Sequence, residues 1–225
     1  MSQLLDLLNE LDVVVDVQLF ELALTHRSYA YEAGGLPSNE RLEFLGDAVL
    51  EIVVTDHIYR TYPELSEGEL AKLRASVVSA VALAGIARRL GIGPMIKLGR
   101  GEIATNGADK KSILADTTEA IIGAIYLSSS MAGAERFIHH IFDPLIVESL
   151  TVGDYSDHKT TIQELSARHG WQVVYEVEGS GPDHNREYHA TVFIDGVARG
   201  QGTAPNKRRA EQLAARQAVA ELGDA

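Results

Sequence analysis

The chain of 225 residues contains no cysteine. Disulfide bonds, thiolate metal sites and cysteine nucleophiles are therefore excluded. A cysteine-free chain suits a reducing compartment, so we expect a cytoplasmic protein. The chain also lacks an uncharged apolar run of 18 residues, and Asp6, Glu10 and Asp12 interrupt the apolar residues near its start. We therefore expect neither a transmembrane helix nor a signal peptide, and no membrane partner.

Positive charge is scarce. The sequence has 20 Lys and Arg against 32 Asp and Glu, which gives a net charge of −12. Such a balance is unusual for a protein that binds nucleic acid. From residue 158 onward, however, 8 basic residues stand against 9 acidic ones, which leaves 12 basic and 23 acidic residues in 1–157. The acidity belongs to the first part, whereas the second part is nearly neutral.

Strand-like alternation is almost absent before residue 148. Apolar residues recur there at helical spacing, and this predicts helices over 4–11, 17–31, 39–62, 66–90, 111–128 and 131–148. A polar linker is expected at 149–157. The pattern then predicts a helix, three strands and a helix over 159–169, 171–178, 187–195, 197–203 and 206–222. The expected fold is an all-α domain of residues 1–148, followed by a small α+β (α-β-β-β-α) domain of residues 158–225.

The most unusual segment is Asn39–Leu50, which combines acids with apolar residues. In a helix, Glu40, Glu43 and Asp47 fall within a stripe about 60° wide. The apolar residues around the stripe predict a helix that is buried nearly all round. Burying three unpartnered carboxylates would cost more than the net stability of a domain. We therefore expect a divalent cation beside the stripe, with ion pairs to Arg41 or Lys110 as the alternative.

A second acidic pair, Asp116 and Glu119, precedes another strongly apolar run. The two residues are three positions apart and so share a helix face. Two helices that present acids to each other would form an oxygen-only site suited to Mg²⁺ or Mn²⁺. Such sites activate water and neutralise charge in phosphodiester hydrolysis. A solvated helix face is the alternative for either pair taken alone.

Basic residues gather at the start of the last predicted helix, where Lys207, Arg208 and Arg209 are consecutive. Cations there oppose the helix dipole by a few tenths of a kcal/mol, and a bound phosphate would reverse the effect. A turn at 181–184 could enter a minor groove, and 161–164 on the preceding helix could reach a second groove. The alternative is a solvated basic turn.

Three motifs now carry a specific resemblance. Residues 39–47 read N-E-R-L-E-F-L-G-D, which resembles in full the signature nonapeptide of the ribonuclease III family. Residues 25–28 resemble the block upstream of that signature, and 111–120 resemble the second acidic motif of the family. The last 65 or so residues resemble a double-stranded-RNA-binding domain, whose basic helix start matches Lys207 and Arg208. The resemblance covers essentially the whole chain.

The resemblance implies roles for residues of the first domain. The metal ligands would be Glu43, Asp47, Asp116 and Glu119, of which Asp47 and Glu119 are the expected catalytic residues. Glu40 and Glu67 would support the site, and Phe44 would pack at a dimer interface.

The resemblance also implies the RNA contacts of the second domain. Gln163, Glu164 and His184 would enter the minor groove, and Lys207 and Arg208 would bind phosphates across the major groove. One departure from the family pattern is Ala204-Pro205, where many relatives have Gly or Ser.

The activity that follows is a Mg²⁺-dependent endoribonuclease, with Mn²⁺ as a substitute, that cleaves double-stranded RNA. The family resemblance implies 5′-phosphate and 3′-hydroxyl ends with two-nucleotide 3′ overhangs, a homodimer, and substrates among rRNA and mRNA precursors. Two other readings remain open. The chain could be a non-catalytic double-stranded-RNA binder, or an acidic α-helical scaffold with an RNA tether and no metal dependence.

Overall fold

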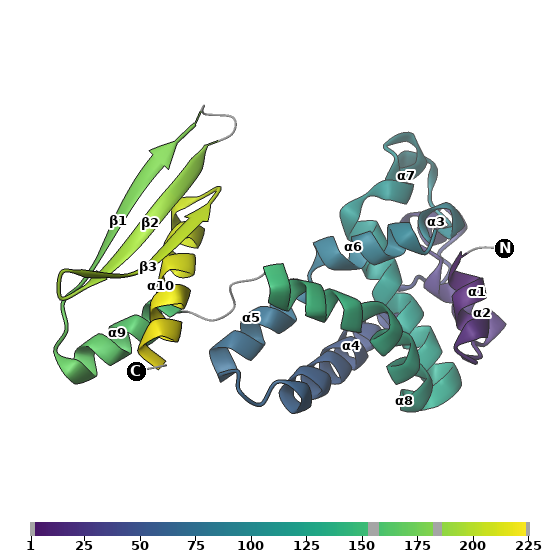
Figure 1. Cartoon of the computed structure of the whole chain (residues 1–225). Helices are drawn as coiled ribbons and strands as arrows, with labels where there is room; N and C mark the ends of the chain where they lie inside the picture. Colours follow the sequence, from purple (N-terminus) through teal and green to yellow (C-terminus); the bar gives the residue numbers. More distant parts are fainter. Residues whose placement is uncertain (1–2, 153–157, 182–185, 224–225) are drawn as a thin grey trace. The chain divides into compact units, whose positions relative to one another are not determined.

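The computed structural model describes residues 3–152, 158–181 and 186–223 (Figure 1). The chain forms two compact units, Met1–Leu150 and Thr151–Ala225. The first unit is helical. Its helices are α1 (Gln3–Glu10), α2 (Val17–Ala23), α3 (Arg27–Glu32), α4 (Glu40–Thr61), α5 (Glu67–Val77), α6 (Ala80–Arg89), α7 (Arg100–Ala104) and α8 (Lys111–Val152), with 3-10 turns at Gly93–Met95 and Gly107–Asp109. The prediction of an all-α first domain is confirmed.

Two of the predicted helices are each divided in the structure. The segment 17–31 breaks where His26 caps α3, because its side chain accepts a hydrogen bond from the Ser28 amide. The segment 66–90 breaks where Ser79 caps α6 in the same way, through the Ala82 amide. Apolar periodicity runs through both breaks, so only the local capping interactions mark them.

Two other predicted helices, 111–128 and 131–148, are joined in α8. Non-helical backbone angles at Ser129 and Ser130 mark a kink between them, and φ of Ser130 is 59°. The helix continues to Val152, so residues 149–152 of the predicted linker are helical. Residues 153–157 lie outside the described part of the chain.

Helices α4 and α8 cross at backbone contact, and two glycines permit this. A Cβ atom on Gly46 of α4 would collide with the carbonyl oxygen of Glu119 of α8. A Cβ atom on Gly123 would likewise collide with the carbonyl oxygen of Leu42. Since Glu43 lies one turn before Gly46, the crossing brings acids of the two helices to the same place.

The prediction that α4 is buried nearly all round is wrong. Its buried residues occupy one side: Leu42, Gly46, Val49, Leu50, Val53, Val54 and Ile58. Large apolar residues on another side are exposed, namely Phe44 (81%), Ile52 (54%) and Tyr59 (69%). Because these three recur at helical spacing, they form one apolar stripe along α4. We call it the α4 stripe.

The second unit has the predicted α-β-β-β-α order, which confirms the fold class. Its elements are α9 (His158–His169), β1 (Val173–Ser180), β2 (Glu187–Ile194), β3 (Val197–Ala204) and α10 (Lys207–Gly223). The strands form an antiparallel sheet in the order β1-β2-β3. Asp195 and Gly196 join β2 to β3 with positive φ angles of 49° and 78°, as a two-residue type I′ turn requires.

The two helices cover one face of this sheet (Figure 1). The core consists of Ile162 from α9, small and branched residues of β2 and β3, and four alanines of α10. Gly200 and Gly202 of β3 allow α10 to lie close, because a Cβ on either would collide with a carbonyl oxygen of α10. The alanine-rich face of α10 and the glycines of β3 are therefore complementary.

Within the described residues, no single helix has the length and hydropathy to cross a membrane. Helices α5 and α6 satisfy both criteria only when taken together across a bend of 42°.

Candidate active site and RNA-binding surface

Three predicted metal ligands converge beside the crossing of α4 and α8. Glu43, Asp116 and Glu119 each offer a carboxylate oxygen, and these atoms lie within 4.8 Å of one another. Asp47 is exposed and lies outside this tight group. Its charge nevertheless acts on Glu119 more strongly than that of any other residue. We refer to the four residues as the acidic cluster.

Three carboxyl groups of the acidic cluster have raised pKa values. The pKa of Glu119 is raised from 4.5 to about 8, mainly by burial and then by the negative charges of Asp47, Asp116 and Glu43. Burial also raises the pKa values of Glu43 and Asp116. A bound cation would stabilise the ionised forms of these neighbouring carboxylates.

The upstream block 25–28 supplies two further groups beside the acidic cluster. His26 is buried, and its Nδ1 accepts a hydrogen bond from the Ser28 amide and lies 2.8 Å from Ser28 Oγ. Burial lowers the pKa of His26 and so favours the neutral form of its imidazole. His26 and Arg27 line a hollow of about 150 Å³ together with Glu40, Glu43 and Asp116.

Glu40 lies at the edge of the acidic cluster, outside the tight group. Its carboxylate accepts a hydrogen bond from Ser38 Oγ at 2.7 Å and pairs with the Arg27 guanidinium at 3.7 Å. Glu40 therefore helps to place Arg27, a residue that sequence reasoning left without a role. The signal that could have found Arg27 was its place in the upstream block.

The expectation of three buried acids on α4 is corrected. Glu40 and Asp47 are exposed, and only Glu43 is partly buried, because the acidic stripe lies at the margin of the covered face of α4. Lys110 also does not form the alternative ion pair with the acids of α4. Lys110 Nζ lies 2.6 Å from Glu102 and 2.7 Å from Thr105 Oγ1.

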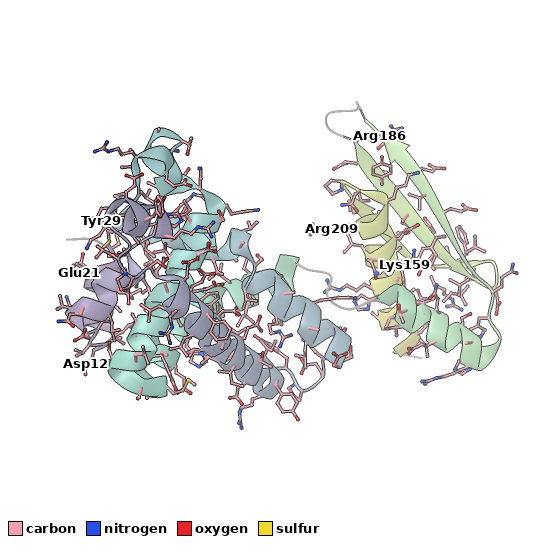
Figure 2. All side chains as sticks on the ribbon, turned by 180° about the vertical axis from the view of Figure 1, so that it is seen from behind. Asp12, Glu21, Tyr29, Lys159, Arg186 and Arg209 are labelled. Atoms are coloured by element: carbon pink, nitrogen blue, oxygen red, sulfur yellow. The ribbon has the colours of Figure 1, made fainter. Side chains whose placement is uncertain are left out.

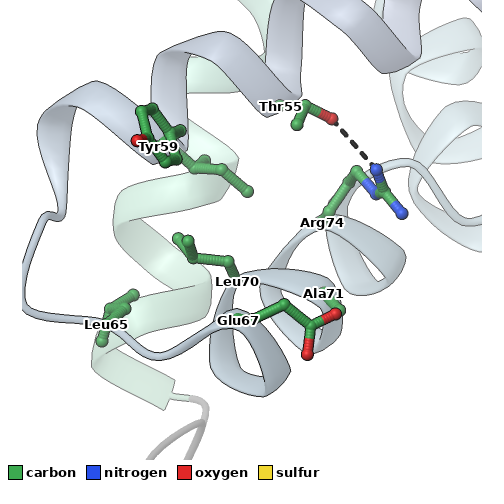
Figure 3. Close-up of a pocket in the computed structure, with 8 residues that line it drawn as sticks. Thr55, Tyr59, Leu65, Glu67, Leu70, Ala71 and Arg74 are labelled. Carbon is green, nitrogen blue, oxygen red and sulfur yellow. Dashed lines mark hydrogen bonds between the residues drawn. The ribbon is translucent and has the colours of Figure 1, made fainter.

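Glu67, expected to support the site, begins α5 and is exposed. It lines a pocket of about 340 Å³ between α4 and α5 (Figure 3). In that pocket, Arg74 donates a hydrogen bond to Thr55 Oγ1 at 3.2 Å. The capping residue of α5 is Ser66, whose partner in the capping box is Glu69. The structure thus places Glu67 outside the acidic group of Glu43, Asp116 and Glu119.

In the second unit, the basic start of α10 is well formed. Asn206 caps this helix by accepting a hydrogen bond from the Arg209 amide at 2.9 Å. Lys207 is exposed, and its Nζ lies 5.9 Å from the ring centre of Tyr188 on β2. Arg186 lies just before β2 (Figure 2). Its Cζ atom is 5.9 Å from the centre of the same ring. Arg186 is a candidate that sequence reasoning missed, since it is distant from Lys207 in the chain.

The other predicted RNA contacts are only partly described. Gln163 and Glu164 are exposed on α9, where a ligand can reach them. His184 and the side chain of Arg208 lie outside the described residues.

The fold and the acidic cluster define a class: a helical unit with a phosphodiesterase-like acidic centre, joined to a small α+β nucleic-acid-binding unit. Comparison with known proteins is specific. Residues 16–145 match the family model described as Ribonuclease-III-like, and residues 158–222 match the double-stranded RNA binding motif. The chain therefore belongs to the ribonuclease III family and is an endoribonuclease with a double-stranded-RNA-binding domain.

Named relatives are similar in sequence to this chain over most of its length. The chain is 58% identical to Ribonuclease 3 of Thermobifida fusca over 197 residues, which cover 87% of this chain and 82% of that protein. It is 56% identical to Ribonuclease 3 of Streptomyces coelicolor, over 87% of this chain and 71% of that protein. A solved nuclease domain of ribonuclease III from Campylobacter jejuni, described as flexible in a region involved in dimer formation, is 39% identical. The match covers 61% of this chain and 96% of the solved domain, with a TM-score of 0.55.

Proposed function

We propose that the protein is a Mg²⁺-dependent endoribonuclease that cleaves double-stranded RNA. The products would carry 5′-phosphate and 3′-hydroxyl ends with two-nucleotide 3′ overhangs, as the family resemblance implies. The observation that carries the proposal is the convergence of Glu43, Asp116 and Glu119 within 4.8 Å, with Asp47 acting electrostatically on Glu119.

The donor set fits a hard divalent cation. Carboxylate oxygens are the ligands that Mg²⁺ and Mn²⁺ prefer, and the absence of nitrogen or sulfur donors in the acidic cluster disfavours softer metals. Glu43, Asp47, Asp116 and Glu119 would hold the ion. When bound, such an ion lowers the pKa of coordinated water and neutralises charge on the phosphodiester.

The side chains around the acidic cluster would orient the RNA. Arg27 is exposed at the edge of the hollow, and its guanidinium lies 3.7 Å from the carboxylate of Glu40. A guanidinium in this place can bind a backbone phosphate beside the scissile bond. Asp47 and Glu119 are the proposed catalytic residues. We propose that Glu67 approaches the RNA near the scissile region, which is consistent with its exposure at the start of α5.

A homodimer is part of the proposal. A staggered cut needs one site for each strand, whereas one chain carries one acidic cluster. The α4 stripe offers an apolar contact surface, since Phe44 is 81% exposed. A symmetric pair related by a twofold axis would bury this stripe and present two acidic clusters to one duplex.

The second domain would hold the duplex by its shape. We propose minor-groove contacts from Gln163, Glu164 and His184 and phosphate contacts from Lys207 and Arg208. The exposed Lys207 near Arg186 supports a phosphate-binding role for this end of α10. We propose that residues 1–148 form the nuclease domain and that residues 158–225 form the RNA-binding domain.

By family resemblance, we propose rRNA and mRNA precursors as natural substrates. The cysteine-free sequence is consistent with the cytoplasm as the place of action.

The decisive experiment is cleavage of a labelled, perfectly paired RNA duplex with and without Mg²⁺. We expect Mg²⁺-dependent cutting to two-nucleotide 3′ overhangs. Glu119→Ala should reduce cleavage by at least about 10²–10³-fold and retain duplex binding, since the loss of a group that stabilises the transition state has costs of this order. An intact, shifted duplex in Mg²⁺ would indicate the non-catalytic binder, and full cleavage by Glu119→Ala would disprove the ligand assignment.

A further inference from the structure

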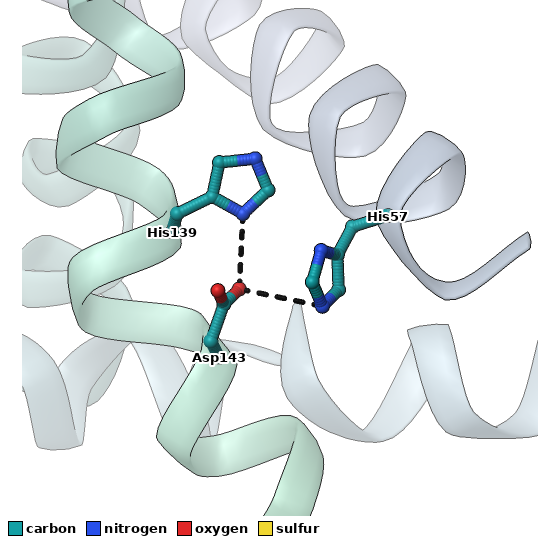
Figure 4. A group of neighbouring side chains, drawn as sticks. All are labelled: His57, His139 and Asp143. Carbon is teal, nitrogen blue, oxygen red and sulfur yellow. Dashed lines mark hydrogen bonds and ion pairs between the residues drawn. The ribbon is translucent and has the colours of Figure 1, made fainter. Parts of the chain in front are cut away.

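A second group of metal-ligating side chains lies between α4 and the second half of α8 (Figure 4). His57 comes from α4, whereas His139 and Asp143 lie one turn apart on α8. The three residues offer ligand atoms within 4.8 Å of one another. Two imidazole nitrogens and one carboxylate oxygen form a donor set of a different kind from the acidic cluster, which offers oxygen alone.

The spacing of these donors suits a small tetrahedral ion. Both imidazoles face the same oxygen of Asp143: Nδ1 of His139 is 3.0 Å from Oδ1, and Nε2 of His57 is 3.7 Å from it. Zinc has bonds of about 2.0–2.1 Å to such donors, so tetrahedral ligands lie about 3.3–3.4 Å apart. The two observed separations lie on either side of that value. Small side-chain rotations would therefore bring both pairs to ligand distances.

The three side chains are partly exposed to solvent. The side chains of His57, His139 and Asp143 are 23%, 39% and 39% exposed. A site of this kind is open to solvent, so water can complete the coordination. The two imidazole rings have centroids 4.9 Å apart and are tilted by 60°, so they do not stack on each other.

We propose that His57, His139 and Asp143 bind a borderline transition-metal ion, in the first place Zn²⁺, with water as the fourth ligand. Imidazole nitrogen favours Zn²⁺, Co²⁺ and Ni²⁺ over Mg²⁺. Because the ligands come from two helices, the ion cross-links the last turns of α4 to the part of α8 beyond its kink. The site is separate from the acidic cluster, because the two groups share no residue.

Calorimetric titration of the untagged full chain with ZnCl₂ in excess Mg²⁺ tests the proposal, since Mg²⁺ competes for the acidic cluster. The test variant is His57→Gln with His139→Gln. His140→Gln is the matched control, because His140 is the exposed neighbour of His139 on α8. We expect the wild type and the control to bind Zn²⁺ alike, and the double variant to bind it at least about 10–100-fold more weakly. Equal binding by all three proteins would overturn the site.

A second measurement does not depend on the double variant and covers the case in which that variant does not fold. Cobalt added to the wild-type chain in excess Mg²⁺ should give the intense visible absorption of four- or five-coordinate Co²⁺ with nitrogen ligands. Asp143→Asn keeps the shape of the side chain and should weaken that absorption. Only the faint absorption of six-coordinate, oxygen-bound Co²⁺ would refute the proposal.

Discussion

At the scale of single residues, Glu119 is the most informative group of the acidic cluster. Its carboxyl is raised to a pKa of about 8 because it is buried and faces acids from both helices: Asp47, Glu43 and Glu51 of α4 and Asp116 of α8. Without a cation, the folded protein therefore keeps a proton on Glu119 at pH values where the unfolded chain has lost it.

The sign of the pH dependence follows. Between about 4.5 and about 8, the unfolded chain binds fewer protons at Glu119 than the folded chain, so stability falls as pH rises. We expect the metal-free wild type to lose stability through this range, whereas Glu119→Gln should lack this part of the loss. Denaturant unfolding followed by helical circular dichroism measures the difference. Parallel curves for the two proteins from pH 5 to 8 would contradict the assignment.

At the scale of helices, the crossing of α4 and α8 determines the site. Apolar periodicity predicted α4 as one helix and α8 as two, 111–128 and 131–148, and the acids on each were identified from their spacing. The divided helices α2–α3 and α5–α6 were not predicted, because a capping side chain interrupts a periodic segment without changing its apolar pattern. The burial of α4 was also mispredicted, since a helix of mostly apolar residues can expose some of them in a stripe along one side.

We expect Gly46→Ala to damage the crossing. The new methyl group would collide with the Glu119 carbonyl, so the helices must separate, at a cost of about 1–3 kcal/mol in stability. Cleavage should fall at least tenfold, because Glu43 and Glu119 would move apart. Thermal unfolding and duplex cleavage measure the two effects.

Gly85→Ala is the matched control for this substitution. Gly85 lies within α6, and a Cβ there meets open space. Alanine at this position should raise helix stability by up to about 1 kcal/mol and leave cleavage unchanged. If Gly46→Ala behaved like Gly85→Ala, the close approach of α4 and α8 would not matter for the site.

At the scale of the whole molecule, the charges are divided between the two domains. The first 157 residues hold most of the excess negative charge, so the second domain must supply much of the attraction for RNA. Its contribution is expected to come from phosphate contacts at the start of α10, where Asn206 caps the helix and Lys207 is exposed.

Lys207→Ala combined with Arg208→Ala should therefore weaken duplex binding similarly for different sequences. The slope of the logarithm of the binding constant against the logarithm of the salt concentration should become shallower by up to about 2. A control with the same change in net charge is Arg168→Ala with Arg216→Ala, both exposed elsewhere on the domain. If the control changed the slope as much as the test variant, net charge alone would explain the effect.

The sequence by itself determined the two-domain organisation, most of the helical segments, the three strands, and the acids of the proposed site. These depend on local periodicity and on motifs that stay readable along the chain. The tertiary structure decided which acids meet, which face of α4 stays exposed, and that Arg27 lies beside the acidic cluster. It also brought His57 to His139 and Asp143. Each of these depends on contacts between residues far apart in the sequence, and backbone approaches such as that at Gly46 have no local periodic signal.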